Sequence, residues 1–275
     1  MTLFYSPAKI NLYLRVLSRR ADGYHEIASL IQAVSLFDEL SIKISDRDRF
    51  FCSDPLLAVD DRNLVIKALN LFRKKSSISS CFEISLIKKI PHEAGLGGGS
   101  SNAATTLWGI NQLLGFPIST RDLQSWSAEI GSDIPFFFSL GIAHCTGRGE
   151  KVENLSATCN FQADSPMTLV KPAFGLSTPQ VFARCSPVGD LDPDNYLEGV
   201  LEGTEERIND LEMAALQLAP QITDLKKEMA LSLKRPMMTG SGSVFFGVGE
   251  LKKPLVNASQ FHQVKPVYRT VDDWY

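Results

Sequence analysis

Four glycines in five positions, Gly95, Gly97, Gly98 and Gly99, follow an alternating apolar segment and precede a helix-like run from Ala103. Ordering each of them costs roughly 0.5–1 kcal/mol more than ordering an alanine. A chain accepts that cost where bare main chain is needed. Free backbone N–H groups next to a helix N-terminus form a site for anions, most often phosphate. The loop therefore predicts phosphate chemistry.

The loop departs from two familiar phosphate motifs. No Gly-Lys-Ser/Thr sequence ends it, as a Walker A loop requires. Ser100 stands where the third glycine of a dinucleotide fingerprint would be. A structural turn or linker is the alternative interpretation, although linkers are rarely framed so tightly by a strand and a helix.

Lys9 and Asn11 are the first polar candidates. Apolar and polar residues alternate through residues 9–16, which predicts a strand with Lys9 and Asn11 on one face, about 6.5–7 Å apart. Lys9 could be a solvated charge. Beside a carboxylate, it would instead keep that acid ionised and stabilise negative charge that develops on a transferred group.

Asp133 is a lone acid between Gly131 and the apolar residues 134–138. It could cap a helix that has Pro135 in its first turn. Near a phosphate site, a carboxylate can also accept the proton of an attacking hydroxyl group. The local sequence favours neither interpretation.

Tyr24, His25 and Lys88 complete the candidates. Tyr24 and His25 follow an Asp-Gly turn, where they could stack on a planar ring and bond its edge, or form a plain surface pair. Lys88 falls on the apolar face of a strand around residues 82–86. Its side chain could extend to solvent or reach a ligand held by the loop.

The surrounding pattern predicts the elements that position these residues. Helices are expected at residues 63–75, 103–114 (capped by Ser100 or Ser101), 121–130, 205–218 and 222–233. Further strands are expected at 27–44 and 167–170, and a proline-flanked loop at 171–179. Residues 238–246 contain a second glycine turn that could close over the site or form a hairpin. A change in composition at 145–165 predicts a domain boundary.

Composition limits the classes of protein that fit. The 275 residues are 44% hydrophobic and 21% charged, with a net charge of −3, which is ordinary for a soluble globular protein. No apolar stretch approaches the roughly 20 residues that span a bilayer, and residues 1–7 carry no secretory signal. We expect a cytoplasmic monomer or weak homodimer with no nucleic-acid or membrane partner.

Six short segments occur in an order that resembles the GHMP kinase superfamily. They are P-A-K-I-N-L-Y-L (7–14), R-R-A-D-G-Y-H-E (19–26), A-G-L-G-G-G-S-S-N-A-A (94–104), G-S-D-I-P-F-F (131–137), N-D-L-E (209–212) and M-T-G-S-G-S (238–243). The resemblance implies an α+β, two-domain fold. A ribosomal S5 domain 2-like N-terminal domain would occupy residues 1–155, a ferredoxin-like C-terminal domain 156–275, and the site would lie between them.

The resemblance also implies roles for the candidates in an ATP- and Mg²⁺-dependent small-molecule kinase. Asp133 would be the catalytic base and Lys9 its charge partner. The first two segments favour a branch whose acceptor alcohol carries a cytidine diphosphate group, bound by Asn11, Tyr24, His25, Thr178 and Phe182, with the cytosine between Tyr24 and Phe182. ATP would be bound by Asn63, Lys88, Pro91, Gly95, Leu96, Gly97, Gly98, Gly99, Ser100, Ser101 and Asn102.

Several alternatives stay open. The Mg²⁺ ligands are undetermined, with a hydroxyl group of Ser100 or Ser101 as a candidate. A sister kinase acting on a mevalonate- or homoserine-type alcohol, or a catalytically silent nucleotide sensor, would share the same motifs. Glu93 stands where the superfamily loop has glycine, and the tail after Phe246 is short for the superfamily.

Overall fold

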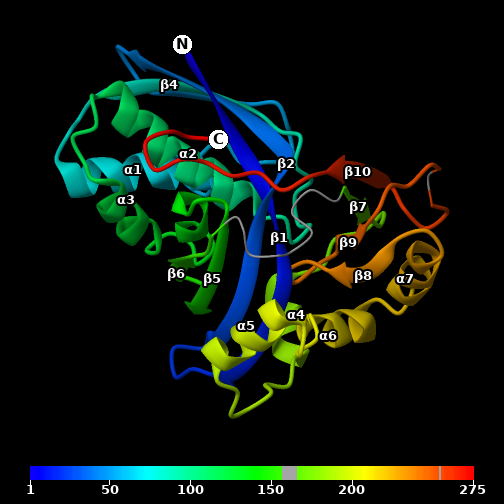
Figure 1. The fold of residues 1–275 in the computed structure, drawn as a ribbon. Helices are drawn as coiled ribbons and strands as arrows, with labels where there is room; N and C mark the ends of the chain where they lie inside the picture. Colours follow the sequence, from blue (N-terminus) through cyan, green and yellow to red (C-terminus); the bar gives the residue numbers. More distant parts are fainter. Residues whose placement is uncertain (157–165, 254) are drawn as a thin grey trace.

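Two β-sheets organise the chain in the computed structural model, which describes residues 1–156, 166–253 and 255–275 (Figure 1). The first sheet has the order β3-β4-β2-β5-β6, with β1 also paired to β2. Its strands are β1 (Thr2–Arg19), β2 (His25–Ser45), β3 (Arg49–Cys52), β4 (Cys81–Ile87), β5 (Ile142–Gly147) and β6 (Lys151–Asn154). The second sheet, in the order β10-β7-β9-β8, contains β7 (Met167–Lys171), β8 (Lys234–Met238), β9 (Phe245–Val248) and β10 (Gln260–Val264).

Helices cover each sheet separately, which makes the fold α+β. The first sheet packs against α1 (Leu64–Ser76), α2 (Gly98–Leu113), α3 (Thr120–Ser127) and the short 3₁₀ helix η1 (Pro135–Phe138). The later helices are α4 (Thr178–Arg184), α5 (Pro193–Glu202), α6 (Leu211–Leu218) and α7 (Ile222–Ala230). Helix α1 buries Val65, Ala68, Leu69 and Phe72, a stripe at helical spacing that forms the expected amphipathic face.

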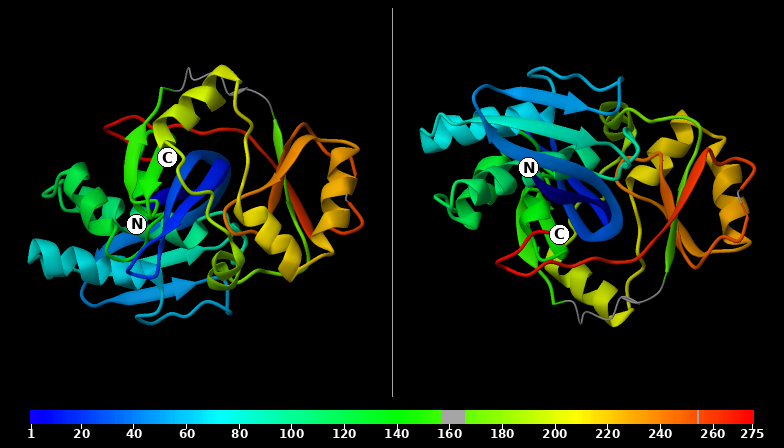
Figure 2. Two further views of the ribbon diagram at one scale, coloured as in Figure 1. Left: turned by 90° about the horizontal axis from the view of Figure 1, so that it is seen from below. Right: turned by 90° about the horizontal axis from the view of Figure 1, so that it is seen from above.

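The long hairpin of β1 and β2 joins the two halves of the structure (Figure 2). Near its N-terminus, β1 packs beneath α2, whereas Ile10, Leu12 and Leu17 share a core cluster with second-sheet residues such as Leu169 and Phe246. The strand expected at 9–16 is confirmed and is part of a much longer element. Because β1 passes from one core to the other, Lys9 and Asn11 lie where the two sheets meet.

Two expectations for the second half of the chain are wrong. The helix expected at 205–218 begins only at Leu211, because the side chains of Asn209 and Asp210 bond to groups of β1 and of the turn after β8. The loop expected at 171–179 ends at Thr178, where α4 begins. Helix α5 was not expected, although its signal is present: the Asp192 side chain caps it, with a proline at the next position.

The last residues return to the first sheet. Strand β10 pairs with β7, after which the backbone N–H of Val267 donates to the Ala33 carbonyl. In both views of Figure 2 the tail runs from the second sheet back toward the N-terminal half. The predicted boundary at 155/156 adjoins residues 157–165, which lie outside the described part, and stays a prediction. Among the described residues, no helix combines the length and apolar character needed to cross a bilayer.

The tail is fixed by a buried cage around Arg269. The Arg269 guanidinium lies 5.0 Å from the Trp108 ring centroid and 5.1 Å from that of Trp274. It also donates to the carbonyls of Phe138 and Ser139. Trp274 is buried and donates from its indole N–H to the Tyr5 carbonyl. The sequence shows only short apolar runs here, so this anchor could not be predicted from periodicity.

Replacing Trp274 by alanine should therefore destabilise the whole protein. We expect Trp274→Ala to lower the free energy of unfolding by about 3 kcal/mol or more, since it removes a buried aromatic ring and leaves a cavity. Denaturant titration followed by circular dichroism measures this change. Val271→Ala, at a side chain that is 66% exposed in the same tail, should change stability by less than about 0.5 kcal/mol. Equal effects in the two variants would contradict the anchoring role.

Candidate functional site

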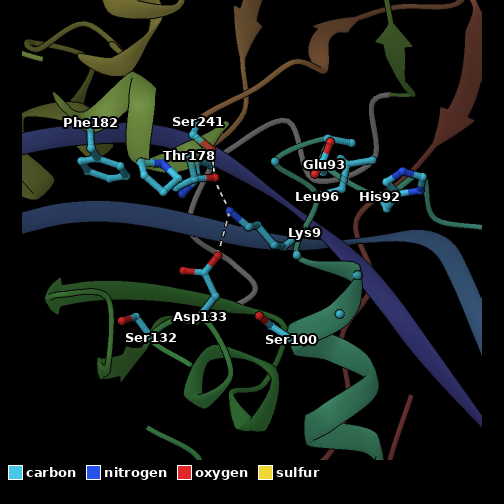
Figure 3. A pocket seen from close by; sticks show the side chains of 18 of the residues that line it. Lys9, His92, Glu93, Leu96, Ser100, Ser132, Asp133, Thr178, Phe182 and Ser241 are labelled. Carbon is cyan, nitrogen blue, oxygen red and sulfur yellow. Dashed lines mark hydrogen bonds and ion pairs between the residues drawn. The ribbon is translucent and has the colours of Figure 1, made fainter. Parts of the chain in front are cut away.

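A cleft of about 1120 Å³ lies between the two halves of the structure (Figure 3). It is lined by the loop before α2, the tip of the β1–β2 hairpin, α4 and the turn after β8. All but one of the residues predicted for the site line it: Lys9, Asn11, Tyr24, His25, Asn63, Lys88, Pro91, Gly95, Leu96, Gly97, Gly98, Gly99, Ser100, Asn102, Asp133, Thr178 and Phe182. Ser101 is the exception, because its side chain is fully buried behind the first turn of α2.

Helix α2 begins inside the glycine loop. Its first residue is Gly98, and Gly97 is the N-cap residue with no side-chain hydrogen bond. The expected cap at Ser100 or Ser101 is therefore wrong, since both lie in the first helical turn. The first backbone N–H groups of a helix have no partner within the helix. Ser100 marks this end of α2 at the cleft (Figure 3), so the positive end of the helix faces the cavity.

Two loop glycines are also required by close packing. Gly95 has φ +73°, and a Cβ atom there would lie 2.2 Å from the Thr239 carbonyl oxygen. Gly97 has φ +67°, and its Cβ atom would lie 2.9 Å from Lys9 Cγ. The Lys9 backbone N–H donates to the Leu96 carbonyl. The loop is thus held against β1 on one side and the turn after β8 on the other.

Lys9 lies at the centre of the site and is only 3% exposed, so its interpretation as a solvated charge is wrong. Its Nζ atom donates to Asn11 Oδ1 at 2.7 Å and lies 3.4 Å from Asp133 Oδ2 (Figure 3). Helix η1 starts without a side-chain cap, so the structure does not use Asp133 in that way. The Asp133 side chain is 40% exposed and faces the cleft. A carboxylate that is both paired and accessible can exchange protons with a bound molecule.

Asn11 is fixed from three directions. Its Nδ2 group donates to Ser29 Oγ, and its backbone N–H donates to Thr239 Oγ1. Its Oδ1 atom accepts from both Lys9 and the Thr239 hydroxyl group. These bonds set which end of the Asn11 amide faces Lys9. The expected common face of Lys9 and Asn11 is confirmed.

Lys88 belongs to a second buried charge cluster. Its side chain is only 7% exposed, so it does not extend into bulk solvent. Its Nζ atom pairs with Asp38 and donates to Asn102 Oδ1 at 3.2 Å. Asp38 is fully buried and also accepts from the backbone N–H groups of Lys89 and Ile90 and from Asn102 Nδ2. Sequence reasoning missed Asp38, whose only signal was an acidic residue inside the long apolar strand 27–44.

Aromatic rings line another wall of the cleft. His25 stacks on Phe182 with ring centroids 5.2 Å apart, and Tyr24 is 54% exposed. Arg148, which was not predicted, holds its guanidinium 4.9 Å from the Tyr24 ring centroid. Burial, with the nearby charge of Arg19, lowers the pKa of His25 below its usual value of 6.5. A lower pKa favours the neutral form of His25, in which one ring nitrogen donates and the other accepts.

The remaining predicted residues have mainly structural contacts. Asn63 caps α1, since its side chain accepts from the Val65 backbone N–H and donates to the Ala58 carbonyl. Thr178 Oγ1 lies 2.7 Å from Ser241 Oγ. Glu93 adopts φ +51°, the left-handed conformation that glycine occupies most easily.

In the described residues, no group of three or more His, Cys, Asp and Glu side chains is placed to hold a metal ion.

Comparisons with known proteins find relatives in one family of small-molecule kinases. The family described as "GHMP kinases N terminal domain" matches residues 63–141. The 4-diphosphocytidyl-2-C-methyl-D-erythritol kinase of Protochlamydia amoebophila is 47% identical over 91% of this chain and 85% of its own length. The chloroplastic enzyme of the same name from Arabidopsis thaliana is 44% identical over 91% of this chain and 68% of its own. A crystal structure of 4-(cytidine 5'-diphospho)-2C-methyl-D-erythritol kinase is similar with a TM-score of 0.74 and 34% identity, covering 90% of each chain.

The packing of the glycine loop can be tested with two matched glycines. Gly95→Ala should lower the free energy of unfolding by roughly 2–5 kcal/mol, because left-handed strain and a collision with the Thr239 main chain add together. Gly115 also has a positive φ, of +80°, but a Cβ atom there would meet nothing within 4 Å. Gly115→Ala should cost only the strain, roughly 1–2 kcal/mol. Chemical denaturation of both variants measures the difference, and equal losses would show that the loop is not clamped at Gly95.

Proposed function

The chain belongs to the 4-diphosphocytidyl-2-C-methyl-D-erythritol kinase family of the GHMP kinases, and we propose that it transfers the γ-phosphoryl group of ATP to the 2-hydroxyl group of 4-diphosphocytidyl-2-C-methyl-D-erythritol. Membership makes it a small-molecule kinase. The proposed reaction is a step of the non-mevalonate route to isoprenoids. The observation that carries the proposal is the Lys9–Asp133 pair, 3.4 Å apart, in a cleft that also receives the N-terminus of α2.

Asp133 would act as the general base. Its carboxylate accepts the proton of the acceptor hydroxyl group while that oxygen forms a bond to the γ-phosphorus. The bond between this phosphorus and the oxygen bridging to the β-phosphate breaks, and ADP leaves with the electron pair. Lys9 would keep Asp133 ionised before the transfer and stabilise the negative charge that develops during it. The 40% exposure of the Asp133 side chain supports direct contact with a substrate.

The loop and α2 would hold the phosphates of ATP. Their backbone N–H groups and the helix dipole favour a polyanion, and Lys88, paired with Asp38, lines the same wall. Mg²⁺ usually needs only one or two protein oxygens, because phosphates and water complete its shell. The cleft offers such a donor in Ser100 Oγ, whereas the Ser101 hydroxyl group is buried. When bound, Mg²⁺ would neutralise phosphate charge.

The aromatic wall would bind the cytidine part of the substrate. Tyr24 and Phe182 present partly exposed rings to the cleft, which suits stacking on a pyrimidine. Neutral His25 offers a hydrogen-bond donor and an acceptor for the edge of a base. Asn11 and Thr178 line the space toward Lys9, where the erythritol hydroxyl groups would lie. The lowered pKa of His25 favours the neutral ring that this recognition of a base requires.

One assay tests the proposed function against its alternatives. The wild-type protein is incubated with Mg²⁺-ATP and, separately, the cytidine alcohol, mevalonate or homoserine, and ADP release is recorded. Turnover of the cytidine alcohol is the expected result. Turnover of only mevalonate or homoserine would identify a sister kinase. Binding of ATP without turnover of any alcohol would identify a nucleotide sensor.

Replacing the proposed base should slow the chemical step. We expect Asp133→Ala to lower kcat about 10²–10⁴-fold while the KM for ATP stays nearly unchanged, since Asp133 contacts the acceptor rather than the nucleotide. Steady-state ADP release with both substrates varied measures this. Asp272→Ala, which removes an exposed carboxylate from the tail, is the control and should match the wild type. Near wild-type turnover in Asp133→Ala would remove this residue from the mechanism.

Trimming the aromatic wall should affect only one substrate. Tyr24→Ala and Phe182→Ala should each raise the KM for the cytidine alcohol roughly 5–100-fold, because alanine removes a stacking face worth about 1–3 kcal/mol. The KM for ATP should change little. Phe51→Ala removes another exposed ring, 55% accessible on β3, and should change neither constant. Equal losses for both ligands in the Tyr24 and Phe182 variants would indicate a general folding defect instead.

A further inference from the structure

The N-D-L-E segment at residues 209–212 contains a buried amide with every polar atom in use. Asn209 is 4% exposed. Its Nδ2 group donates to the carbonyl oxygens of Met238 and Gly240, both at 2.8 Å. Its Oδ1 atom accepts from the Leu211 backbone N–H at 3.0 Å. The side chain therefore fixes two carbonyl groups on either side of Thr239.

The turn held by Asn209 forms one wall of the Lys9 site. Thr239 is fully buried, and its hydroxyl group accepts from the Asn11 backbone N–H at 3.0 Å and donates to Asn11 Oδ1 at 3.2 Å. The next residue, Gly240, is so close that a Cβ atom there would lie 3.2 Å from Lys9 Nζ. A shift of this turn would change both the acceptor of Lys9 and the space around its ammonium group.

We infer that Asn209 is a positioning residue for phosphoryl transfer, acting through the turn at Met238–Thr239–Gly240 on Asn11 and Lys9. The inference rests on the proposed function, in which Lys9 supports the base. Asn209 does not line the cleft and so has no contact with a substrate there. Its effect is on geometry: it holds the Thr239 hydroxyl group toward Asn11, whose Oδ1 atom receives Lys9 Nζ at 2.7 Å.

The two acidic residues of the segment, Asp210 and Glu212, bond to groups that do not contact the Lys9 ammonium group. Asp210 accepts from Arg15 Nε and the Val16 backbone N–H on β1. Glu212 accepts from the Met238 backbone N–H and pairs with Lys226. These bonds fasten the segment to β1 and β8. Among the side chains of the segment, only the Asn209 amide bonds to Gly240, the residue beside the Lys9 ammonium group.

The first experiment separates positioning from stability. Asn209→Ala is compared with Lys226→Met, which breaks the Glu212 pair on the same segment. Displacement of reacting groups by about 1 Å can slow a reaction up to roughly 10²-fold, so we expect kcat to fall about 10–100-fold in Asn209→Ala. The KM for ATP and its Kd from calorimetry should stay within about threefold, and Lys226→Met should keep kcat within about twofold. A less stable Asn209→Ala protein with wild-type kcat would overturn the inference.

The second experiment tests the route through Thr239 and does not need Asn209→Ala to fold. Thr239→Val keeps the shape but loses the hydroxyl group, whereas Thr239→Ser keeps the hydroxyl group. We expect kcat to fall about tenfold or more in the valine variant and to stay within about threefold in the serine variant. If both residues act through one turn, the Asn209→Ala/Thr239→Val double variant should be no slower than the slower single variant. Equal kcat in the valine and serine variants, or losses that multiply in the double variant, would overturn the inference.

The assay uses whichever alcohol the wild-type protein phosphorylates fastest among the cytidine alcohol, mevalonate and homoserine. A wild type that rejects the cytidine alcohol would refute the proposed substrate. An active wild type whose kcat is unaffected by Asn209→Ala and Thr239→Val would refute only the positioning role. The two failures are therefore distinguishable.

Discussion

Burial of the Lys9 ammonium group is the constraint on which the site depends. A charge that is 3% exposed is stable only if nearby groups compensate for the water it has lost. Asn11 and Asp133 provide a hydrogen bond and an opposite charge. Gly97 and Gly240 leave space for the lysine, because a Cβ atom at either position would crowd its side chain. These partners come from β1, the residues before η1, the loop before α2 and the turn after β8, so the ammonium group is a point where both halves of the fold converge.

The glycine loop shows how one sequence pattern can have two physical causes. From the sequence, the bare backbone predicts phosphate binding, with a structural turn or linker as the alternative. The structure adds that Gly95 and Gly97 take positive φ values and approach Thr239 and Lys9 more closely than any side chain would allow. Packing and the proposed anion binding therefore favour the same residues, and the sequence pattern alone cannot separate the two causes. The helix also begins earlier than expected, since Gly97 itself is the N-cap residue.

Sequence periodicity predicted the structural features that depend on residues close together in the chain. It missed the features that depend on contacts between residues far apart in the sequence. The common face of Lys9 and Asn11 follows from strand parity, and the helix of residues 63–75 from its apolar stripe. Asp38 could not be found in this way, because its partner Lys88 is 50 residues further along the chain. The early start expected for helix 205–218 failed for a similar reason. Asn209 makes tertiary hydrogen bonds that hold this segment out of a helix.

The two buried lysines, Lys88 and Lys9, differ in how firmly their carboxylate partners are held. Asp38 is fully buried and accepts four hydrogen bonds, so the Lys88 cluster is already complete and rigid before any ligand binds. Asp133 is 40% exposed, and its only ion pair in the described part of the chain is the 3.4 Å contact with Lys9. Releasing a fully paired buried acid would leave an uncompensated charge, which costs several kcal/mol. Asp133 has fewer partners and is open to the cleft, which supports the proposal that the chemistry takes place at its pair with Lys9 while the Lys88 cluster positions the wall that would hold the phosphates.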